Sequence, residues 1–330
     1  MAEPQKPSLL RRWLTSLLFL YALVLVIYLL LRWIVQANWS LLLLGHTIAF
    51  YLFLPVIAGL VIAMLLRARR LAGFYWLLTI IGLVWFVPRM MPPLSEPQQN
   101  GTSLKIISFN MFPENQRLDD VTTWLLAQDA DVIGLQEIGV DLPLLADEYP
   151  YFVSQDVVNG QALFSRYPIQ MTETVQLGDI PQQRHLLNIN GLPVVLYNLH
   201  LYMPLNEDES QTLFLRYDES RRNRQINELL TFIAGENQPT IVMGDFNMSE
   251  FSPIYGRLNA RLHDAYRVTS WGLGQTWPGG ASEELGDNFP PLFRLDYVWY
   301  TDGIQALEAQ VGSRLGSDHL PLIVNLDIRG

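Results

Sequence analysis

Three long runs without a charged residue constrain this chain more than any other feature. They comprise 19 residues from Trp13 to Leu31, 27 from Ser40 to Leu66 and 18 from Leu71 to Pro88. A bilayer core about 30 Å thick is crossed by roughly 17 to 25 apolar residues in a helix, so each run is long enough to span it. We therefore predict three transmembrane helices, at about 13–35, 40–66 and 71–87.

The first run has an alternative interpretation as a cleaved secretory signal, because Arg11 and Arg12 precede it. The apolar part of such a signal is usually about 7 to 15 residues long and is followed by a small-x-small cleavage site. This run is longer and leads into Arg32 and Trp33 instead. An uncleaved span is the interpretation that these features favour.

Basic residues at the ends of the runs predict their orientation, because basic flanks tend to stay cytoplasmic. One cluster precedes the first run and another separates the second from the third: Lys6, Arg11 and Arg12, and Arg67, Arg69 and Arg70. Three spans then place everything after Pro88 on the outer side. Arg32 and Arg89 lie on the predicted outer flanks of the spans and favour the opposite orientation, but each is a single basic residue and not a cluster. We expect a multi-pass protein of the cytoplasmic (inner) membrane, with its soluble part in the periplasm or outside the cell.

Residues 88–103 are rich in turn-forming residues and lack periodicity, which indicates a linker between a membrane anchor at 1–87 and a soluble domain at 104–330. A linker of this length spans about 20 Å as a flexible coil, so it would keep the soluble domain near the bilayer. The chain has no cysteine, which excludes disulfide and thiolate chemistry.

Net charge divides the chain at the same place. Residues 1–100 carry eight basic and two acidic residues, a net charge of +6, whereas the remainder carries 14 basic and 30 acidic residues, a net charge of −16. Proteins that bind long nucleic acids neutralise phosphates with Lys and Arg. The acidic soluble domain therefore disfavours nucleic acid as a partner.

Short apolar runs bounded by turn residues predict seven buried strands in the soluble domain: 104–109, 131–138, 161–164, 193–199, 240–243, 297–300 and 320–326. Helical spacing of apolar residues predicts helices at 118–127 and 221–234. Because strands outnumber helices and are only partly interleaved with them, a sandwich of two sheets flanked by helices fits this count.

Polar clusters end or interrupt these strands, so acids, amides and histidines are delivered to one edge of a sheet. In chain order they are Ser108-Phe109-Asn110, Leu135-Gln136-Glu137, Leu163 to Ile169, Tyr197-Asn198-Leu199-His200, Gly244-Asp245-Phe246-Asn247, Arg294-Leu295-Asp296-Tyr297 and Ser317-Asp318-His319. This ordered series resembles the endonuclease/exonuclease/phosphatase superfamily over residues 104–327. The resemblance implies an α/β fold, a four-layer α/β/β/α sandwich.

The resemblance implies a metal-dependent phosphoesterase. Glu137 would supply a carboxylate to Mg²⁺, with Mn²⁺ as the alternative ion, and Asn110 and Asp318 would complete or support the metal site. Mg²⁺ prefers oxygen ligands and typically takes one or two carboxylates plus substrate phosphate. Such an ion would polarise the phosphoryl oxygen and stabilise the leaving group.

The same resemblance implies roles for five catalytic residues. Asp296 would orient His319, making the imidazole a better proton acceptor and stabilising its charged form. Asp245 would orient or help to deprotonate the attacking water, and Asn247 would bind a phosphate oxygen. His200 would donate a hydrogen bond or a proton at the scissile phosphate.

Polar residues outside the motifs have less specific interpretations. His185 and His263 are expected at the surface or behind the site. Arg222 lies on a predicted helix with Glu219, a pattern typical of a solvated face with intrahelical ion pairs. Arg166 and Arg184 are the remaining arginines that could approach a phosphate.

The substrate is the least determined property. The loops 202–217 and 270–293 would choose the leaving group, and the aromatic residues of the second loop could stack on a base, contact acyl chains or pack the loop. Anchoring at a bilayer favours a lipid-linked or small phosphoester. The alternatives are an extracytoplasmic nuclease acting on DNA or RNA and a non-catalytic binding module. No obligate protein partner is inferred.

Overall fold

The computed structural model describes residues 8–36, 39–93, 99–139, 142–155, 160–206, 210, 212–280 and 289–329. Parts of the predicted linker and loops, at 94–98, 207–209, 211 and 281–288, lie outside the described residues. Contacts divide the chain into two compact units. One comprises Met1–Arg89 with Asn206–Tyr217, and the other comprises Met90–Leu205 with Asp218–Gly330.

The first unit is built from apolar helices. They are α1 (Leu9–Leu30, continued by a π-helical turn, Leu31–Val35), α2 (Ser40–Thr47), α3 (Ala49–Leu65), α4 (Arg69–Phe86, followed by a 3-10 turn, Val87–Arg89) and the short α7 (Leu213–Arg216). Among the described residues, α1 with its extension and α4 are long and apolar enough to cross a membrane. Helices α2 and α3 would make a third span if the two together cross the membrane once.

The second predicted span is not one straight helix. It is bent by 70° between α2 and α3, at Ile48, which has φ −94° and ψ 13°. Apolar composition alone does not report such a break, because both halves are uncharged and rich in apolar residues. Pro55 lies inside α3 without ending it.

Close packing joins α1, α3 and α4. Gly59 leaves room for the Tyr75 ring, since a Cβ at Gly59 would lie 2.1 Å from that ring. The Tyr75 hydroxyl donates to the carbonyl of Leu18 at 2.9 Å. His46 is buried rather than at the helix surface, and its Nδ1 lies 3.3 Å from the Tyr28 hydroxyl.

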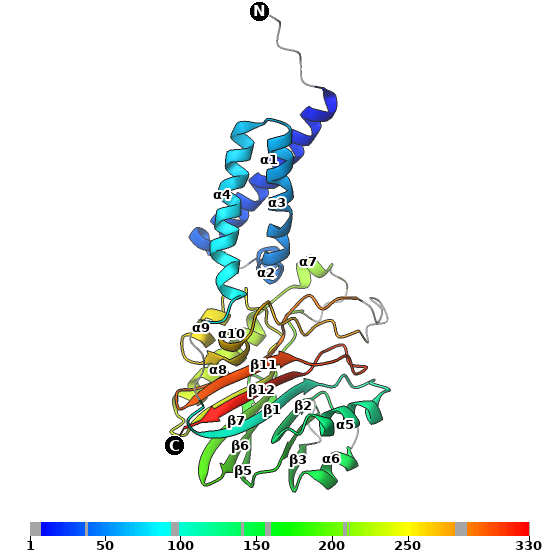
Figure 1. Cartoon of the computed structure of the whole chain (residues 1–330), viewed down its shortest axis with the longest axis vertical. Helices are drawn as coiled ribbons and strands as arrows, with labels where there is room; N and C mark the ends of the chain where they lie inside the picture. The colour runs from blue at the N-terminus through cyan, green and yellow to red at the C-terminus, as the bar shows by residue number, and fades with distance from the viewer. Residues whose placement is uncertain are drawn as a thin grey trace, which may run out of the picture. The chain divides into compact units, whose positions relative to one another are not determined.

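The second unit contains two six-stranded sheets, seen in the lower part of Figure 1. In spatial order the first sheet comprises β11 (Ile304–Val311), β12 (Leu322–Ile328), β1 (Thr102–Asn110), β2 (Val132–Gln136), β4 (Gln161–Ser165) and β3 (Tyr151–Gln155). The second comprises β5 (Ile169–Leu177), β6 (Ile180–Ile189), β7 (Leu192–His200), β8 (Thr240–Asp245), β10 (Asp296–Tyr300) and β9 (His263–Asp264).

Three apolar clusters make this unit a four-layer α/β/β/α sandwich, as the sequence predicts. The central cluster lies between the sheets and includes Ile106, Leu196 and Val324. A second cluster packs α8 (Ser220–Ala234) and α9 (Tyr255–Asn259) on the outer face of the second sheet. A third packs α5 (Leu118–Ala127) and α6 (Pro143–Glu148) on the outer face of the first. The short α10 (Ala265–Thr269) joins the central cluster.

The seven predicted strands and both predicted helices are present. The described residues also contain strands that the apolar pattern missed, namely β3, β5, β6, β9 and β11. Strand β6 carries Gln182, Gln183 and His185 facing the interior, where all three are buried. The apolar pattern does not detect this strand, because amides that bond one another inside a core look identical, in sequence, to solvated amides.

Candidate active site

The first sheet brings Asn110 and Glu137 to one edge. Strands β1 and β2 are parallel and pair Asn110 with Gln136, so Glu137 follows at the same edge. Glu137 has a positive φ of 54°, a strained conformation that is commonest at functional sites. The chain can turn here because the adjacent position is Gly160, where a Cβ would lie 2.1 Å from the carbonyl oxygen of Ile138.

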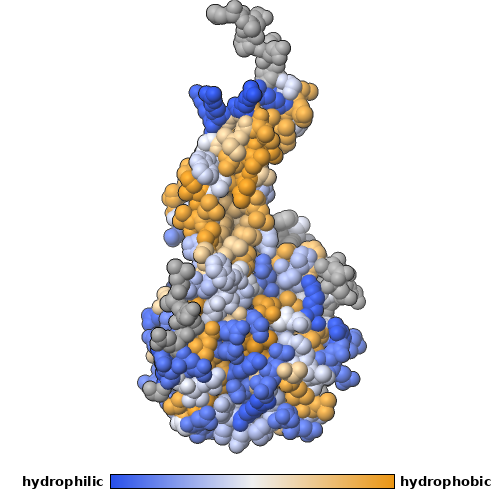
Figure 2. Space-filling model, viewed as in Figure 1, coloured by the Kyte–Doolittle hydropathy of each residue, from blue (hydrophilic) through white to orange (hydrophobic). Residues whose placement is uncertain are grey.

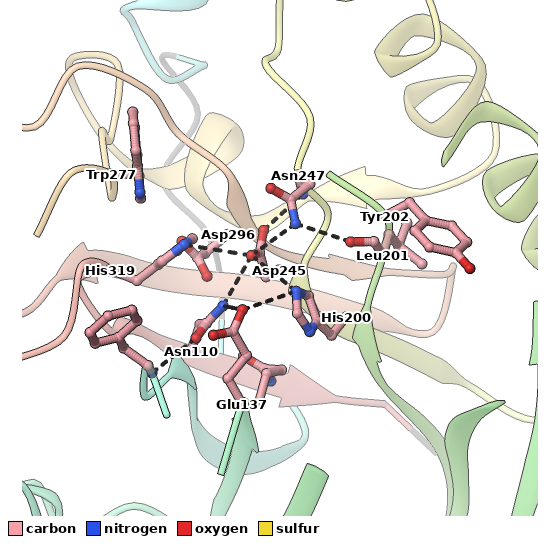
Figure 3. A network of polar contacts seen from close by, with 12 residues as sticks. Asn110, Glu137, His200, Leu201, Tyr202, Asp245, Asn247, Trp277, Asp296 and His319 are labelled. Atoms are coloured by element: carbon pink, nitrogen blue, oxygen red, sulfur yellow. Dashed lines mark hydrogen bonds and ion pairs between the residues drawn. The ribbon is translucent and has the colours of Figure 1, made fainter. Parts of the chain in front are cut away.

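The second sheet brings His200, Asp245 and Asp296 to its own edge. Parallel β7 and β8 pair His200 with Asp245, and antiparallel β10 pairs Asp245 with Asp296. Gly244 is required beside them, because it has φ 140° and a Cβ there would lie 1.9 Å from the carbonyl oxygen of Leu199. Figure 3 shows the side chains from both sheets converging on one place.

Asn110 links the two sheets. Its Nδ2 donates to Glu137 Oε1 at 3.0 Å and to Asp245 Oδ2 at 3.1 Å. Its Oδ1 accepts from the backbone N–H of Phe112 at 3.1 Å. The amide is buried and fully used, so it fixes the separation of the two carboxylates.

His319 and Asp296 form a buried pair. His319 Nδ1 lies 2.8 Å from Asp296 Oδ2, and His319 Nε2 lies 3.6 Å from Asp245 Oδ2. Burial alone would lower the pKa of His319, but the charges of Asp296 and Asp245 and the hydrogen bond that His319 donates to Asp296 outweigh it and raise the pKa to about 10. The imidazole therefore carries a proton at neutral pH in this arrangement.

Asp245 lies at the centre of the cluster. Its side chain is 1% exposed, and burial raises its pKa to about 6, although His319 acts in the opposite direction. Asp245 Oδ1 accepts from the backbone N–H of Asn247 at 2.8 Å, and Oδ2 accepts from Asn247 Nδ2 at 3.2 Å. Asn247 Nδ2 also donates to the carbonyl of Leu201 at 3.0 Å, so both of its N–H groups are used within the site.

His200 faces the accessible carboxylate. Its Nε2 lies 3.2 Å from Glu137 Oε1 and 3.8 Å from Asp245 Oδ2. Burial lowers the pKa of His200, despite the opposite effect of Asp245, so the ring is neutral at neutral pH. A neutral imidazole with one N–H can donate a hydrogen bond without adding charge.

Asp318 lies apart from the central carboxylates. Its Oδ2 accepts from the indole N–H of Trp277 at 3.2 Å, and its carbonyl accepts from the N–H of Gly279. Trp277 in turn stacks on Phe293, with ring centroids 6.0 Å apart. Asp318 thus ties the loop before β10 to the segment that carries His319.

The donor set fits a divalent metal ion. Among the described residues, two overlapping groups place one ligand atom each within 4.8 Å of the others: Glu137, His200 and Asp245, and Asp245, Asp296 and His319. The side chain of Glu137 is 25% exposed, whereas that of Asp296 is not exposed at all. Burial raises the pKa of Glu137, and nearby acids add to this, so a bound cation would favour its ionised form.

Sequence reasoning missed a residue that fixes His200. Gln182 Oε1 accepts from the backbone N–H of His200 at 2.7 Å, and its Nε2 donates to the carbonyl of His200 at 2.9 Å. Gln161 Nε2 also donates to Gln182 Oε1 at 2.9 Å. No local pattern marks this role, because Gln182 lies on a neighbouring strand 18 positions away from His200.

For two polar residues outside the motifs, the predicted surface location is wrong. His185 was expected at the surface or behind the site, and it is completely buried, between the Thr172 hydroxyl and Gln183, which excludes the first alternative. Arg222 is not on a solvated face. Its side chain is 0% exposed, pairs with Glu219 at 2.9 Å and donates to the carbonyl of Asn247 at 2.6 Å.

The remaining polar residues considered in the sequence lie elsewhere. His263 is exposed and contacts Asp302 at 2.9 Å, as expected of a surface histidine. Arg166 pairs with Asp129 at 2.6 Å, beyond the edge of the first sheet opposite the site, so its predicted approach to phosphate is wrong. Arg184 is engaged by Glu236 at 2.7 Å.

Comparisons with known proteins identify the family. The family model described as "Endonuclease/Exonuclease/phosphatase family" matches residues 107–319. A comparison with curated protein sequences returned no match.

Solved structures of similar fold cover the second unit. An endonuclease/exonuclease/phosphatase from Bacteroides vulgatus is 17% identical with a TM-score of 0.55, covering 69% of this chain and 99% of its own. The mannosyl-6-phosphatase Bt3783 of Bacteroides thetaiotaomicron is 17% identical with a TM-score of 0.54, covering 68% and 99%. Truncated Caenorhabditis elegans TDP2 is 16% identical with a TM-score of 0.55, covering 69% and 99%.

At these identities the structures show the fold alone, whereas the family model matches well over half of the chain and covers every motif from Phe109 to His319. Members of that family are divalent-metal-dependent hydrolases of phosphoester bonds. The chain belongs to the endonuclease/exonuclease/phosphatase family.

Proposed function

We propose that this protein is a membrane-anchored phosphoesterase that uses Mg²⁺ to hydrolyse a phosphodiester or phosphomonoester at the outer face of the cytoplasmic membrane. The observation that carries the proposal is the convergence of Asp245, Asp296, His319, His200 and Glu137 at the facing edges of two sheets. Together these side chains provide a metal ligand, a proton acceptor and two imidazole donors that can contact the same bound phosphate.

Glu137 is the principal metal ligand in this proposal, with Asn110 and Asp318 supporting the site. The bound ion supplies Lewis-acid stabilisation of charge on the phosphoryl and leaving oxygens. Asn110 holds Glu137 and Asp245 at a fixed separation through its two hydrogen bonds. A fixed separation matters because catalytic groups act efficiently only when they are oriented before the reaction begins.

Asp245 accepts the proton of the attacking water, whose oxygen forms the new bond to phosphorus as the ester P–O bond breaks. A base operates best when its pKa is near the working pH, and burial has moved the pKa of Asp245 to about 6. Asn247 holds Asp245 through its Nδ2 and its backbone N–H, and Nδ2 binds a phosphate oxygen or the water by exchanging its 3.2 Å bond to Asp245 Oδ2.

His319 stabilises negative charge on the phosphoryl group. Asp296 holds His319 Nδ1. His319 Nε2–H therefore points toward Asp245, whose Oδ2 lies 3.6 Å from Nε2. A protonated imidazole in a buried site strongly favours a transition state that gains negative charge. His200 donates from Nε2 to a second phosphoryl oxygen or to the leaving oxygen, with its backbone fixed by Gln182.

The apolar helices support the membrane part of the proposal. The lipid bilayer is the partner of the first unit, and the clusters of basic residues between spans favour a catalytic domain on the outer side. A tethered site meets lipid headgroups at high effective concentration, which favours a lipid-linked phosphate or another small phosphoester as substrate. A reporter fused after Gly330 tests the orientation: activity of a cytoplasm-only reporter would refute the outer location.

A nuclease that acts outside the cytoplasm is the second candidate. The family name permits it, and the net charge of −16 after residue 100 disfavours it because long nucleic acids require neutralising cations. A non-catalytic binding module would need a lost motif residue, and every motif residue is present.

The test uses the full chain in detergent micelles with Mg²⁺. We expect turnover of bis-p-nitrophenyl phosphate that EDTA abolishes, and release of phosphate or headgroup from phospholipids while plasmid DNA stays intact. Asp245→Asn and His319→Ala should each lower kcat by at least a hundredfold with unchanged circular dichroism. Nicked plasmid with inert lipids would favour the nuclease, and no turnover of any ester would favour the binding module.

A further inference from the structure

The helical unit contains a cavity of about 770 Å³ between α1 and the start of α4. Its α1 wall is formed by apolar side chains such as Phe19, Leu23 and Val26, and Phe74 closes the α4 side. Phe19, Leu23 and Phe74 are 62%, 41% and 40% exposed, so they are accessible from outside the helices. An apolar cavity of this size at the membrane-facing surface is suited to the upper part of an acyl chain.

Three arginines line the other end of the same cavity. Arg67, Arg69 and Arg70 belong to the turn between α3 and α4 and to the first residues of α4, and all three are exposed. The sequence contains no Asp or Glu between Pro4 and Ser95, so no acid in this unit's helices can neutralise them. Figure 2 shows hydrophilic residues gathered at the end of the helices where α1 begins, above a mostly hydrophobic surface.

The turn also offers backbone donors. Helix α4 is 18 residues long and begins after Ala68 without a side-chain cap, so its first N–H groups have no intrahelical acceptor. Unsatisfied N–H groups at a helix start attract anions. Arg67 is held in the left-handed region at φ 53°, in the turn between α3 and α4 that places all three arginines in the lining of the cavity.

We propose that this cavity binds an anionic phospholipid of the surrounding bilayer, with its phosphate against Arg67, Arg69 and Arg70 and one acyl chain along Phe19, Leu23 and Phe74. Charge and shape complementarity carry the inference: a charge of +3, which no acid in the described helices of this unit compensates, adjoins an apolar cavity. Basic pockets between membrane helices on the cytoplasmic side are suited to such headgroups. This lipid site is separate from the catalytic site and rests on the proposed membrane anchoring.

The experiment measures lipid retention by native mass spectrometry of the full chain, purified in detergent and mixed with dioleoyl phosphatidylglycerol or dioleoyl phosphatidylcholine. We expect the anionic lipid to be retained at least fivefold more strongly. Arg70→Gln should weaken its retention about fivefold, as expected for one arginine near a headgroup. Arg89→Gln, which removes one charge at the opposite end of α4, is the matched control and should have no effect.

A second pair of variants tests the apolar part. Leu23→Trp fills the cavity and should lower retention of phosphatidylglycerol, whereas Leu77→Trp adds the same bulk at an exposed position outside the cavity. Equal retention of the two lipids, or equal effects of the two charge variants, would overturn the proposal and leave only general solvation by lipid.

The outcome is independent of hydrolysis, because the readout is bound lipid and not turnover. An inert enzyme that retains phosphatidylglycerol would refute the proposed activity alone. Release of the protein from membranes by alkaline carbonate would instead refute the anchoring on which both the orientation and the lipid site depend.

Discussion

Lowering the pH should destabilise the catalytic unit through His185, a histidine that takes no part in the site. It is fully buried between the sheets, with Nδ1 3.0 Å from the Thr172 hydroxyl and Nε2 3.3 Å from Gln183 Oε1. Burial lowers the pKa of His185 from 6.5 to about 4. Among the residues that the structure describes, no carboxylate compensates for a proton on this ring.

The pKa values determine the sign and the size of the effect. Between pH 6.5 and 4 the unfolded chain binds a proton at His185 that the folded chain does not, so stability is lost as the pH falls through this interval. Applying the two pKa values of His185, the loss between pH 7.5 and pH 5 is about 2 kcal/mol, and it levels off near pH 4. Above pH 6.5 both states are neutral and His185 contributes no pH dependence.

His185→Gln isolates this contribution, because glutamine keeps a donor and an acceptor but does not titrate. Urea unfolding of the full chain in detergent, followed by tryptophan fluorescence, gives the free energy of unfolding at pH 7.5 and pH 5. We expect the wild type to lose about 2 kcal/mol more than His185→Gln between these pH values. His263→Gln, at an exposed position, should behave as the wild type.

The comparison of variants is needed because other groups titrate in the same range, including Asp245, whose raised pKa acts in the opposite direction. These contributions cancel when wild type and His185→Gln are compared. Equal losses in the two proteins would show that His185 is protonated in the folded state at pH 5, which would refute the argument from burial.

Three further predictions address the metal, the fold beneath the site and the loop that contacts Asp318. Glu137→Gln should raise the Mg²⁺ concentration for half-maximal turnover at least tenfold, and an unchanged titration curve would exclude Glu137 as the principal ligand. Arg222→Met removes the cation that pairs with buried Glu219, which keeps its hydrogen bond from Ser252 Oγ, and should lower the free energy of unfolding by about 3–5 kcal/mol, measured by urea denaturation; a change below about 1 kcal/mol would contradict a buried pair. Trp277→Ala should raise KM for a lipid phosphoester severalfold more than for a p-nitrophenyl ester, whereas exposed Trp271→Ala should change neither, and equal effects of the two variants would show that Trp277 only packs the loop.

The motif strands could be predicted from sequence because burial on both faces leaves continuous apolar runs. Strand β8 reads Thr-Ile-Val-Met-Gly-Asp and is buried at every position, so its apolar run and its terminal acid are both visible in the sequence. The parallel pairing of β7 with β8 then brings His200 beside Asp245. Strand order and register explain why these two residues meet, whereas the sequence analysis assigned them to one site through the family resemblance.

The residues that hold the site in place could not be predicted in the same way. Gln182 and His185 lie on β6, whose burial depends on the second sheet closing over the first. Arg222 looks like a solvated residue until α8 packs on the sheet and directs its side chain toward the carbonyl of Asn247. Each of these roles exists only after tertiary packing, so local periodicity carries no trace of it.

This fold contains two kinds of polar residue, which differ in how far the sequence determines their neighbours. Residues such as Asp245 lie at strand ends, where chain direction and register alone determine their neighbours. Residues such as Gln182 lie inside strands, where their cost of burial is offset only by partners contributed from elsewhere in the fold. Gln182 bonds both backbone groups of His200, so replacing Gln182 with leucine would leave a buried donor and a buried acceptor unpaired. The catalytic geometry of His200 therefore depends on a residue that no strand-end motif contains.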